Sequence, residues 1–232
     1  MGIIMKKEKT RKLWWLISPT YKFAEKKKLE LIAKSGKPSD LSDALREYNR
    51  RYLLMSISWC VGAAILVPIG HYFFDGGYYA HDFAKYVFGG LVILLSWIFL
   101  ISRAIEIFKA FLDDAVQKLD GDKPSSDLKY GQRLRLSFNS YIELIINFAT
   151  LYYLAPSYYF KDCYQFSTIF EAIYFSGVTI TTLGYGDISP SNPILQLLSV
   201  FQVLAGFSLI VVCFAIYSGL ALGQEKSNNH VN

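Results

Sequence analysis

The sequence predicts an all-α membrane protein, and its hydropathy is the main reason. The chain has 232 residues, of which 53% are hydrophobic and 16% aromatic, an apolar composition for a soluble domain. A helix needs roughly 20 apolar residues to cross a hydrocarbon core of about 30 Å. We therefore predict four transmembrane helices, with a shorter helix that re-enters the membrane between the third and the fourth. The four segments are approximately 52–74, 86–108, 136–155 and 194–222.

The connection between the third and fourth predicted spans contains the run Thr-Ile-Thr-Thr-Leu-Gly-Tyr-Gly-Asp at 179–187. Its composition suits a loop that binds a dehydrated cation. Backbone carbonyls replace the water around such an ion when an extended chain turns successive C=O groups toward one axis. Gly184 and Gly186 tolerate the unusual backbone angles that this requires. A Gly-rich surface turn is the alternative, and the apolar helices predicted on both sides make it the weaker interpretation.

The run resembles the potassium-channel signature Thr-Val-Gly-Tyr-Gly, with Leu183 in the place of the usual Val. This difference is mild, because the side chain would face the wall and only its carbonyl would face the ion. The similarity continues over residues 136–222. There an outer helix, a re-entrant helix, a filter and an inner helix follow one another as in the two-span pore module shared by potassium channels. The residues before this module match no family pattern.

The resemblance implies a passive, K⁺-selective ion channel. Its selectivity filter would consist of Thr182, Leu183, Gly184, Tyr185 and Gly186. The first four carbonyls and the Thr182 hydroxyl would bind K⁺ in stacked sites, and the ions would move by knock-on between them. Since one loop cannot enclose an ion, the chain should assemble as a homotetramer with the filter on the fourfold axis. We expect no organic cofactor and, because no catalytic constellation is visible, no enzyme.

Four further residues are predicted to support the filter: Tyr174, Phe175, Val178 and Asp187. By the resemblance, Tyr174 and Phe175 stand where many family members have a Trp pair, and they should form an aromatic cuff. We expect the Tyr174 hydroxyl to bond to Asp187, which would also place negative charge at the outer mouth. Val178 stands where some relatives have a buried acid that pairs with the filter aspartate, so that pair is absent here.

The inner helix is expected to contain the cavity lining and the gate. Gly206 lies where the family has its inner-helix glycine hinge. Steps of four residues from Gly206 place Ile210, Phe214 and Ser218 on one face, which we predict lines the cavity. Four copies of Phe214 would then form a hydrophobic constriction that gates by dewetting. Packing of Phe214 against the outer helix is the alternative.

Two helix starts can be predicted from their capping residues. The re-entrant helix should cover 168–180, with Thr168 and Glu171 forming a capping box. That role is a better explanation for Glu171 than ion binding. Asn192-Pro193 predicts the start of the inner helix, with a cap followed by Pro at the first helical position.

Charged residues within the predicted helices suggest ion pairs. Arg103, Glu106 and Lys109 are three residues apart and can pair along one helix face. Glu143 lies inside the third predicted span, where ionisable groups are candidates for function. We expect it to pair with Arg103 or Arg135, and a proton site for gating is the less favoured alternative.

The distribution of Lys and Arg predicts the orientation. These residues are concentrated before residue 52 and between 109 and 135, whereas Lys85 and Lys161 represent them in the two other loops. Both termini should therefore be cytoplasmic, with the filter opening outward, in a multi-pass protein of the plasma (cell inner) membrane. The net charge of +5 is explained by topology, so no nucleic-acid partner is expected. The Lys-rich N-terminal arm is a candidate for binding anionic lipid.

Five regions follow from these features. We predict an N-terminal cytoplasmic arm, a transmembrane hairpin, a cytoplasmic linker, a pore module and a short cytoplasmic tail, at 1–51, 52–119, 120–135, 136–222 and 223–232.

Other functions remain open at this stage. A nonselective cation channel is disfavoured because such relatives usually lose the filter tyrosine, and Tyr185 is present. A potassium transporter subunit or a nonconducting membrane sensor is disfavoured because the chain has a single intact pore loop. The hairpin has only Arg103 near the membrane, so it is not expected to sense voltage. The sequence does not indicate the gating stimulus.

Overall fold

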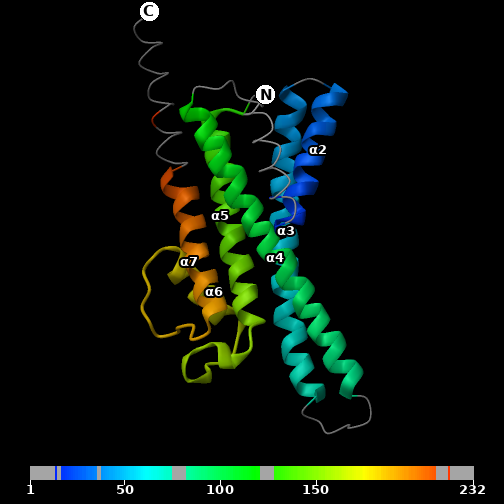
Figure 1. The fold of residues 1–232 in the computed structure, drawn as a ribbon, viewed down its shortest axis with the longest axis vertical. Helices are drawn as coiled ribbons and strands as arrows, with labels where there is room; N and C mark the ends of the chain where they lie inside the picture. The colour runs from blue at the N-terminus through cyan, green and yellow to red at the C-terminus, as the bar shows by residue number, and fades with distance from the viewer. Residues whose placement is uncertain are drawn as a thin grey trace, which may run out of the picture. The chain divides into compact units, whose positions relative to one another are not determined.

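The computed structural model of the chain describes residues 14, 17–35, 38–74, 82–120, 128–212 and 219. The regular elements of this part are helices, and Phe160 and Pro190 form an isolated β-bridge. The all-α fold class is thus confirmed for the described residues (Figure 1). The α-helices are α2 Pro19–Ser35, α3 Pro38–Phe74, α4 Asp82–Leu119, α5 Tyr130–Tyr153, α6 Ile169–Ile180 and α7 Pro193–Phe207. The 3-10 turns Ser157–Tyr159 and Lys161–Cys163 and the π-helical segment Ser208–Val212 complete the order.

Helices α3 and α4 are much longer than a membrane requires. They contain 37 and 38 residues, which at about 1.5 Å per residue gives lengths of about 55 Å, against a hydrocarbon core of about 30 Å. Pro38 at the first position of α3 and Asp40 in its first turn suit a helix N-terminus. Helix α3 thus begins within the region predicted as the N-terminal arm, and α4 continues beyond the predicted span 86–108 to Leu119.

Three helices of the described chain are long and apolar enough to cross a membrane. They are Ser39–Ile69, Gly89–Gln117 and Pro193–Ile210. Four such helices were predicted, and the number four is not confirmed. Helix α5 has 24 residues, so its length suffices to span the bilayer. Helix α5 is less apolar than the three helices named above, because polar and charged side chains interrupt its apolar residues.

Helix α5 starts earlier than its apolar run suggested. The sequence predicted a start near Leu136, whereas the helix begins at Tyr130. Arg133 explains the difference. Its side chain is buried, pairs with Asp114 of α4 at 2.7 Å and donates to the Leu128 carbonyl at 3.2 Å. A neutralised arginine extends the helix beyond its hydrophobic part, and hydropathy alone does not detect such an extension.

The chain divides into two compact units. Unit 1 comprises 1–51, 101–141 and 207–232, and unit 2 comprises 52–100 and 142–206. Helices α3, α4 and α5 each contribute residues to both.

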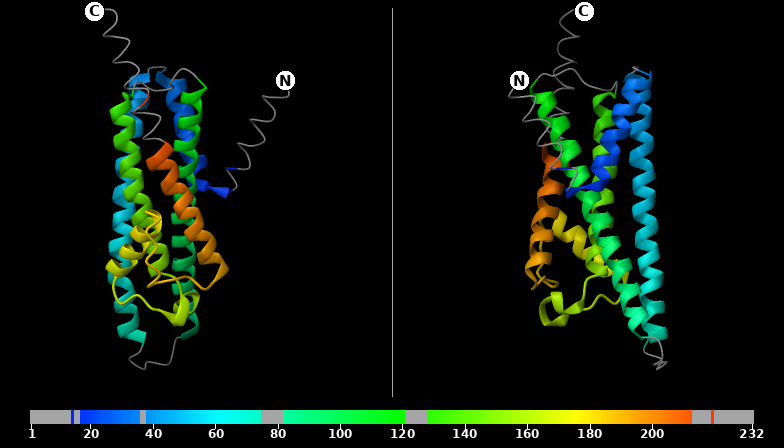
Figure 2. Two further views of the ribbon diagram at one scale, coloured as in Figure 1. Left: turned by 90° about the vertical axis from the view of Figure 1, so that its left-hand side faces the viewer. Right: turned by 45° about the vertical axis from the view of Figure 1, so that its right-hand side comes forward.

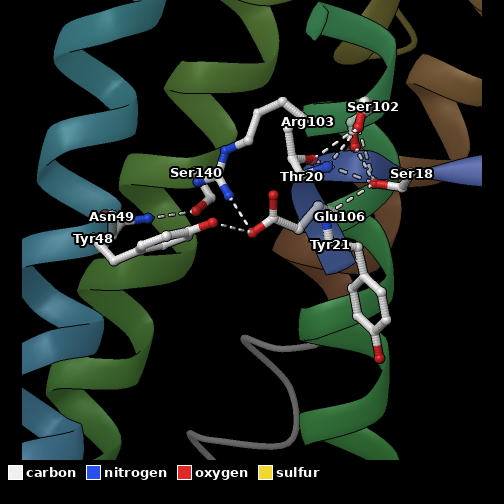
Figure 3. Close-up of polar contacts among 9 residues, drawn as sticks. All are labelled: Ser18, Thr20, Tyr21, Tyr48, Asn49, Ser102, Arg103, Glu106 and Ser140. Carbon is white, nitrogen blue, oxygen red and sulfur yellow. Dashed lines mark hydrogen bonds and ion pairs between the residues drawn. The ribbon is translucent and has the colours of Figure 1, made fainter. Parts of the chain in front are cut away.

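In unit 1, buried hydroxyl groups anchor the start of α2 to α4 (Figure 3). The Ser18 hydroxyl donates to the Ser102 carbonyl at 2.8 Å, and the Thr20 backbone N–H donates to the Ser102 hydroxyl at 3.1 Å. All three residues are buried. Since the first N–H groups of a helix have no partner within it, Ser102 provides one for α2.

A second polar cluster of unit 1 joins α3, α4 and α5 (Figure 3). Arg103 and Glu106 form an ion pair of 2.8 Å with both side chains at most 5% exposed, and the Tyr48 hydroxyl donates to Glu106 at 3.1 Å. Asn49 donates to the Ser140 hydroxyl at 2.7 Å. The predicted pairing of Arg103 with Glu106 is thus confirmed.

Among the ion pairs described for α4, Lys109 is not paired with Glu106, although its spacing had suggested this pair. Lys109 pairs with Asp113, one turn further on. Its ammonium group also lies 5.5 Å from the centre of the Trp14 ring, within the range of a cation–π interaction.

Unit 2 contains a helix hairpin and the elements around α6. Within the hairpin, the Trp59 and Phe99 rings are 6.1 Å apart, which places α3 beside α4. Figure 2 shows the short helix α6 near α5 and α7, followed by the extended segment that leads to α7. This arrangement places residues 181–187 at the end of α6, which packs against two longer helices. These residues contain the predicted selectivity filter and are hereafter called the filter loop.

Candidate functional site: the filter loop and its supports

The N-terminus of helix α6 is capped by side chains. Thr168 is its N-cap, and its hydroxyl accepts the Glu171 N–H at 3.4 Å. The Glu171 carboxylate accepts the Ser167 N–H at 2.8 Å and the Tyr164 hydroxyl at 3.2 Å. The first half of the predicted capping box is confirmed, and the second bond goes to the residue before the cap. Burial and the bond to this carboxylate raise the pKa of Tyr164.

The chain reverses direction at the C-terminus of α6. The Thr182 N–H donates to the Thr179 carbonyl at 3.0 Å, and the N–H groups of Leu183 and Gly184 both donate to the Val178 carbonyl, at 3.0 and 3.3 Å. Val178 therefore contacts the filter loop through its backbone. The role predicted for Val178 from the sequence concerned only its side chain.

These hydrogen bonds fix the direction of two carbonyl groups. In a trans peptide the C=O and N–H point in opposite directions, and the described chain has no cis peptide bond. The Leu183 N–H belongs to the same peptide group as the Thr182 carbonyl, and the Gly184 N–H to that of Leu183. Because both N–H groups point at α6, the carbonyls of Thr182 and Leu183 point away from it.

Backbone angles alternate along the filter loop. Thr182, Gly184 and Gly186 have φ of 62°, 54° and 79°, and Leu183 and Tyr185 between them are not in the positive-φ region. Alternating left- and right-handed residues collect successive N–H groups on one side of the chain and leave the carbonyls on the other. The sequence predicted this need for the two glycines and missed it for Thr182. A β-branched residue rarely adopts this conformation, which costs on the order of 1–3 kcal/mol.

Tyr174 contacts the outer end of the filter loop. Its hydroxyl donates to Asp187 at 2.9 Å, as predicted. Its ring also stacks on that of Tyr185, with centroids 6.4 Å apart and planes 8° from parallel. One side chain of α6 therefore holds two residues of the loop.

Phe175 points in a different direction from Tyr174 and does not share its contacts. It is buried, with its ring 4.8 Å from that of Tyr152 on α5 and about 6 Å from those of Phe160 and Phe166 in the preceding loop. Adjacent helical residues are 100° apart, so one faces the filter loop and the other the core. A cuff made of both residues remains a prediction.

The exit of the filter loop is tied to the segment before α6. Lys161 N–H donates to the Ser189 carbonyl at 2.9 Å, and Ser191 N–H donates to the Tyr159 carbonyl at 2.8 Å. Asn192 then caps α7, since its side chain accepts the Ile194 N–H at 2.8 Å. The start of α7 is as predicted.

A buried polar network behind the filter loop joins α5, α6 and α7. The Gln202 amide donates to the Ser176 carbonyl and hydroxyl at 2.9 and 2.7 Å. The Tyr152 hydroxyl donates to the Gln202 amide oxygen at 2.9 Å and lies 3.1 Å from the Ser199 hydroxyl. Ser176 donates to the Ile145 carbonyl at 2.8 Å. This network was not predicted, although a glutamine within the apolar run of α7 is a signal for it.

Gly206 is buried at a close approach between α7 and α6. A Cβ atom at this position would lie 2.4 Å from Cγ1 of Ile180. Glycine is thus required here by packing, whatever its part in a hinge. The α-helical hydrogen-bond pattern ends at Phe207, and the π-helical segment follows directly.

The predicted cavity face is described only in part. Ile210 lies in the π-helical segment and is 38% exposed. Phe214 and Ser218 lie outside the described residues. Glu143 is fully buried, and its predicted pairing stays a prediction.

The geometry of this region agrees with comparisons to known proteins. Residues 140–221 match the sequence model of the ion channel family, and they contain α6, the filter loop and α7. The match lies within the second half of the chain. Together with the three long apolar helices, it supports a multi-pass membrane protein.

Several relatives carry the name of a potassium channel. YugO of Bacillus subtilis is 34% identical over 67 residues, 29% of this chain and 20% of the relative. Two-pore potassium channels 2 and 3 of Arabidopsis thaliana are 42% identical over 53 residues and 37% identical over 77 residues, which is 22% and 33% of this chain. The chain covers only 12% and 17% of these two relatives. No solved structure matches the chain significantly.

The contact between Tyr174 and Asp187 can be tested by substitution. Tyr174→Phe keeps the ring stacked on Tyr185 and removes the hydrogen bond. We expect the current to inactivate faster by roughly threefold or more, the scale of one solvent-screened hydrogen bond to a charged group. Patch recordings of reconstituted protein would measure the rate.

Tyr164→Phe is the matched control, since it removes a tyrosine hydroxyl that bonds to Glu171 at the start of α6. Equal inactivation rates in the Tyr174→Phe variant and the unmodified protein would show that the bond does not support the filter loop.

Proposed function

We propose that the protein is a passive, K⁺-selective channel whose filter is the loop 182–186. The main support is the filter loop itself, where two carbonyls point away from α6 and the left-handed residues alternate. Ion selectivity by backbone carbonyls requires such a row. The carbonyls of Thr182, Leu183, Gly184 and Tyr185 and the Thr182 hydroxyl would then form stacked K⁺ sites. The names of the relatives support K⁺ as the ion.

The pore would be formed by a homotetramer, because each chain supplies a single filter loop. A face of α7 supports this assembly. Leu197, Val200, Leu204 and Phe207 are three or four residues apart and 54–71% exposed in the single chain. Such an apolar stripe on a helix suits burial against copies of the chain or the lining of a pore. Asp187 and Tyr185 would then lie at the mouth of a shared conduit.

The membrane arrangement is part of the proposal. We infer four spans, with α5 as the third, since α6 and the filter loop need a helix on each side to re-enter from one face. The surplus of Lys and Arg before residue 52 and between 109 and 135 supports cytoplasmic termini in the plasma membrane.

Anionic lipid would be a partner at helix α2. Lys22, Lys26 and Lys27 are exposed there, and so is the apolar ring of Phe23 at 68%. Cations beside an exposed aromatic group suit a negatively charged lipid surface.

Replacing the three lysines by glutamine should weaken binding of the purified protein to vesicles containing phosphatidylserine. Unchanged binding would remove α2 as the lipid site.

A nonselective cation channel is the second candidate, and one measurement separates the two. Purified protein in a planar bilayer, with K⁺ on one side and Na⁺ on the other, should show a reversal potential displaced far toward the K⁺ equilibrium potential. A clear current that reverses near zero would contradict K⁺ selectivity. Gly186→Ala is the control for a current through this loop. At φ of 79° an L-residue is strained, so the variant should lose the K⁺ current.

A further inference from the structure

We propose that Gln202 is a positioning residue for the filter loop, which couples the position of α7 to conduction. Through Ser176 it holds α7 against α6, and α6 in turn holds the loop. This inference rests on the proposed channel function. Its two central residues, Gln202 and Ser176, had no role predicted from the sequence.

The side-chain amide of Gln202 is fully buried, and both its nitrogen and its oxygen are hydrogen-bonded. Both N–H groups go to Ser176, at 2.9 and 2.7 Å, and the oxygen accepts the Tyr152 hydroxyl at 2.9 Å. All three residues are 0% exposed. A buried polar group that loses its partner is strongly penalised, so satisfied networks of this kind have one preferred geometry. Movement of α7 away from α6 would leave several of these groups unpaired.

A second contact lies one helical turn further along both helices. Gly206 follows Gln202 by four residues, as Ile180 follows Ser176. The absence of a side chain at Gly206 lets α7 approach Ile180, whose Cγ1 would lie 2.4 Å from a Cβ there. Together the polar and the apolar contact form a two-turn seam between α7 and α6.

The seam ends where the filter loop begins. Ile180 is the last residue of α6, and the Val178 carbonyl within the same turn accepts the N–H groups of Leu183 and Gly184. A displacement of this turn therefore displaces the peptide groups whose carbonyls would face the ion. The path from Gln202 to the loop consists of direct contacts within unit 2 at each step.

The structure of α7 changes immediately after the seam. Its α-helical pattern ends at Phe207, and residues Ser208–Val212 are π-helical. Single π-helical turns within α-helices frequently lie at functional sites. The seam would hold the preceding part of α7 on α6, so a rearrangement of the π-helical segment would reach α6 through the contacts of Gln202 and Gly206.

Gln202→Leu tests the inference, because it keeps the size of the side chain and removes its bonds to Ser176. Single-channel recording in K⁺ should show open bursts shortened by roughly tenfold, the scale of one lost buried hydrogen bond. Raising external K⁺ should lengthen the bursts again, since an ion bound in the loop resists its collapse. This K⁺ dependence distinguishes closure of the filter from a general loss of folding.

Ser199→Ala is the matched control. Ser199 lies on the same helix as Gln202 and contacts Tyr152 of α5. Within the network described above, its side chain makes no bond to α6. We expect burst lengths within about twofold of the unmodified protein, because the Tyr152 hydroxyl keeps its bond to Gln202 when the Ser199 hydroxyl is removed. If Gln202→Leu behaves like this control at every K⁺ concentration, Gln202 has only a packing role and the inference is wrong.

A second variant covers the case in which Gln202→Leu does not assemble. Ser176→Ala removes the Ser176 hydroxyl, which accepts from Gln202 and donates to the Ile145 carbonyl, and it leaves the other acceptor of Gln202, the Ser176 carbonyl. It should shorten the bursts less than Gln202→Leu and with the same K⁺ dependence; K⁺-independent bursts would overturn the inference. Failure of the channel function itself is seen separately, since the unmodified protein would then show no K⁺-selective current.

Discussion

The reversal of the chain at the C-terminus of α6 is the constraint on which the rest of the site depends. One carbonyl, that of Val178, accepts the N–H groups of both Leu183 and Gly184. Planar trans peptides then force the carbonyls of Thr182 and Leu183 to the opposite side. The packing and capping of α6 keep this arrangement in place. The cap at Thr168 fixes where α6 begins, and the buried residues of α6 fix how it is oriented.

The supports of the loop are distributed over its whole length. Tyr174 holds its outer end through Asp187 and Tyr185, and backbone bonds from Lys161 and Ser191 hold the segment that follows. The inner end adjoins Ile180, where α7 is packed through Gly206. Val178 has no carboxyl group that could pair with Asp187. The Tyr174 hydroxyl donates to Asp187, so this aspartate is bonded by a neutral donor.

Features with a local signature could be predicted from the sequence, and features that depend on the fold could not. Gly184, Gly186 and the cap at Asn192 follow from residue type and spacing, and the Tyr174–Asp187 bond was expected from the resemblance to potassium channels. The left-handed Thr182 could not be predicted, because its conformation is imposed by bonds to α6 against its own preference. Gln202 could not be assigned a role from the sequence, since its partners lie on two other helices. The early start of α5 depends likewise on Asp114 of α4.

Selection of K⁺ by a row of backbone carbonyls can be measured by calorimetric titration of the purified protein. The protein is held in a large organic cation, and K⁺ is added in one titration and Na⁺ in another. We expect saturable K⁺ binding, with Na⁺ binding at least about a hundredfold weaker, which corresponds to about 2.7 kcal/mol. Equal binding of the two ions by the assembled protein would contradict it, because the loop would then have no carbonyl sites matched to K⁺.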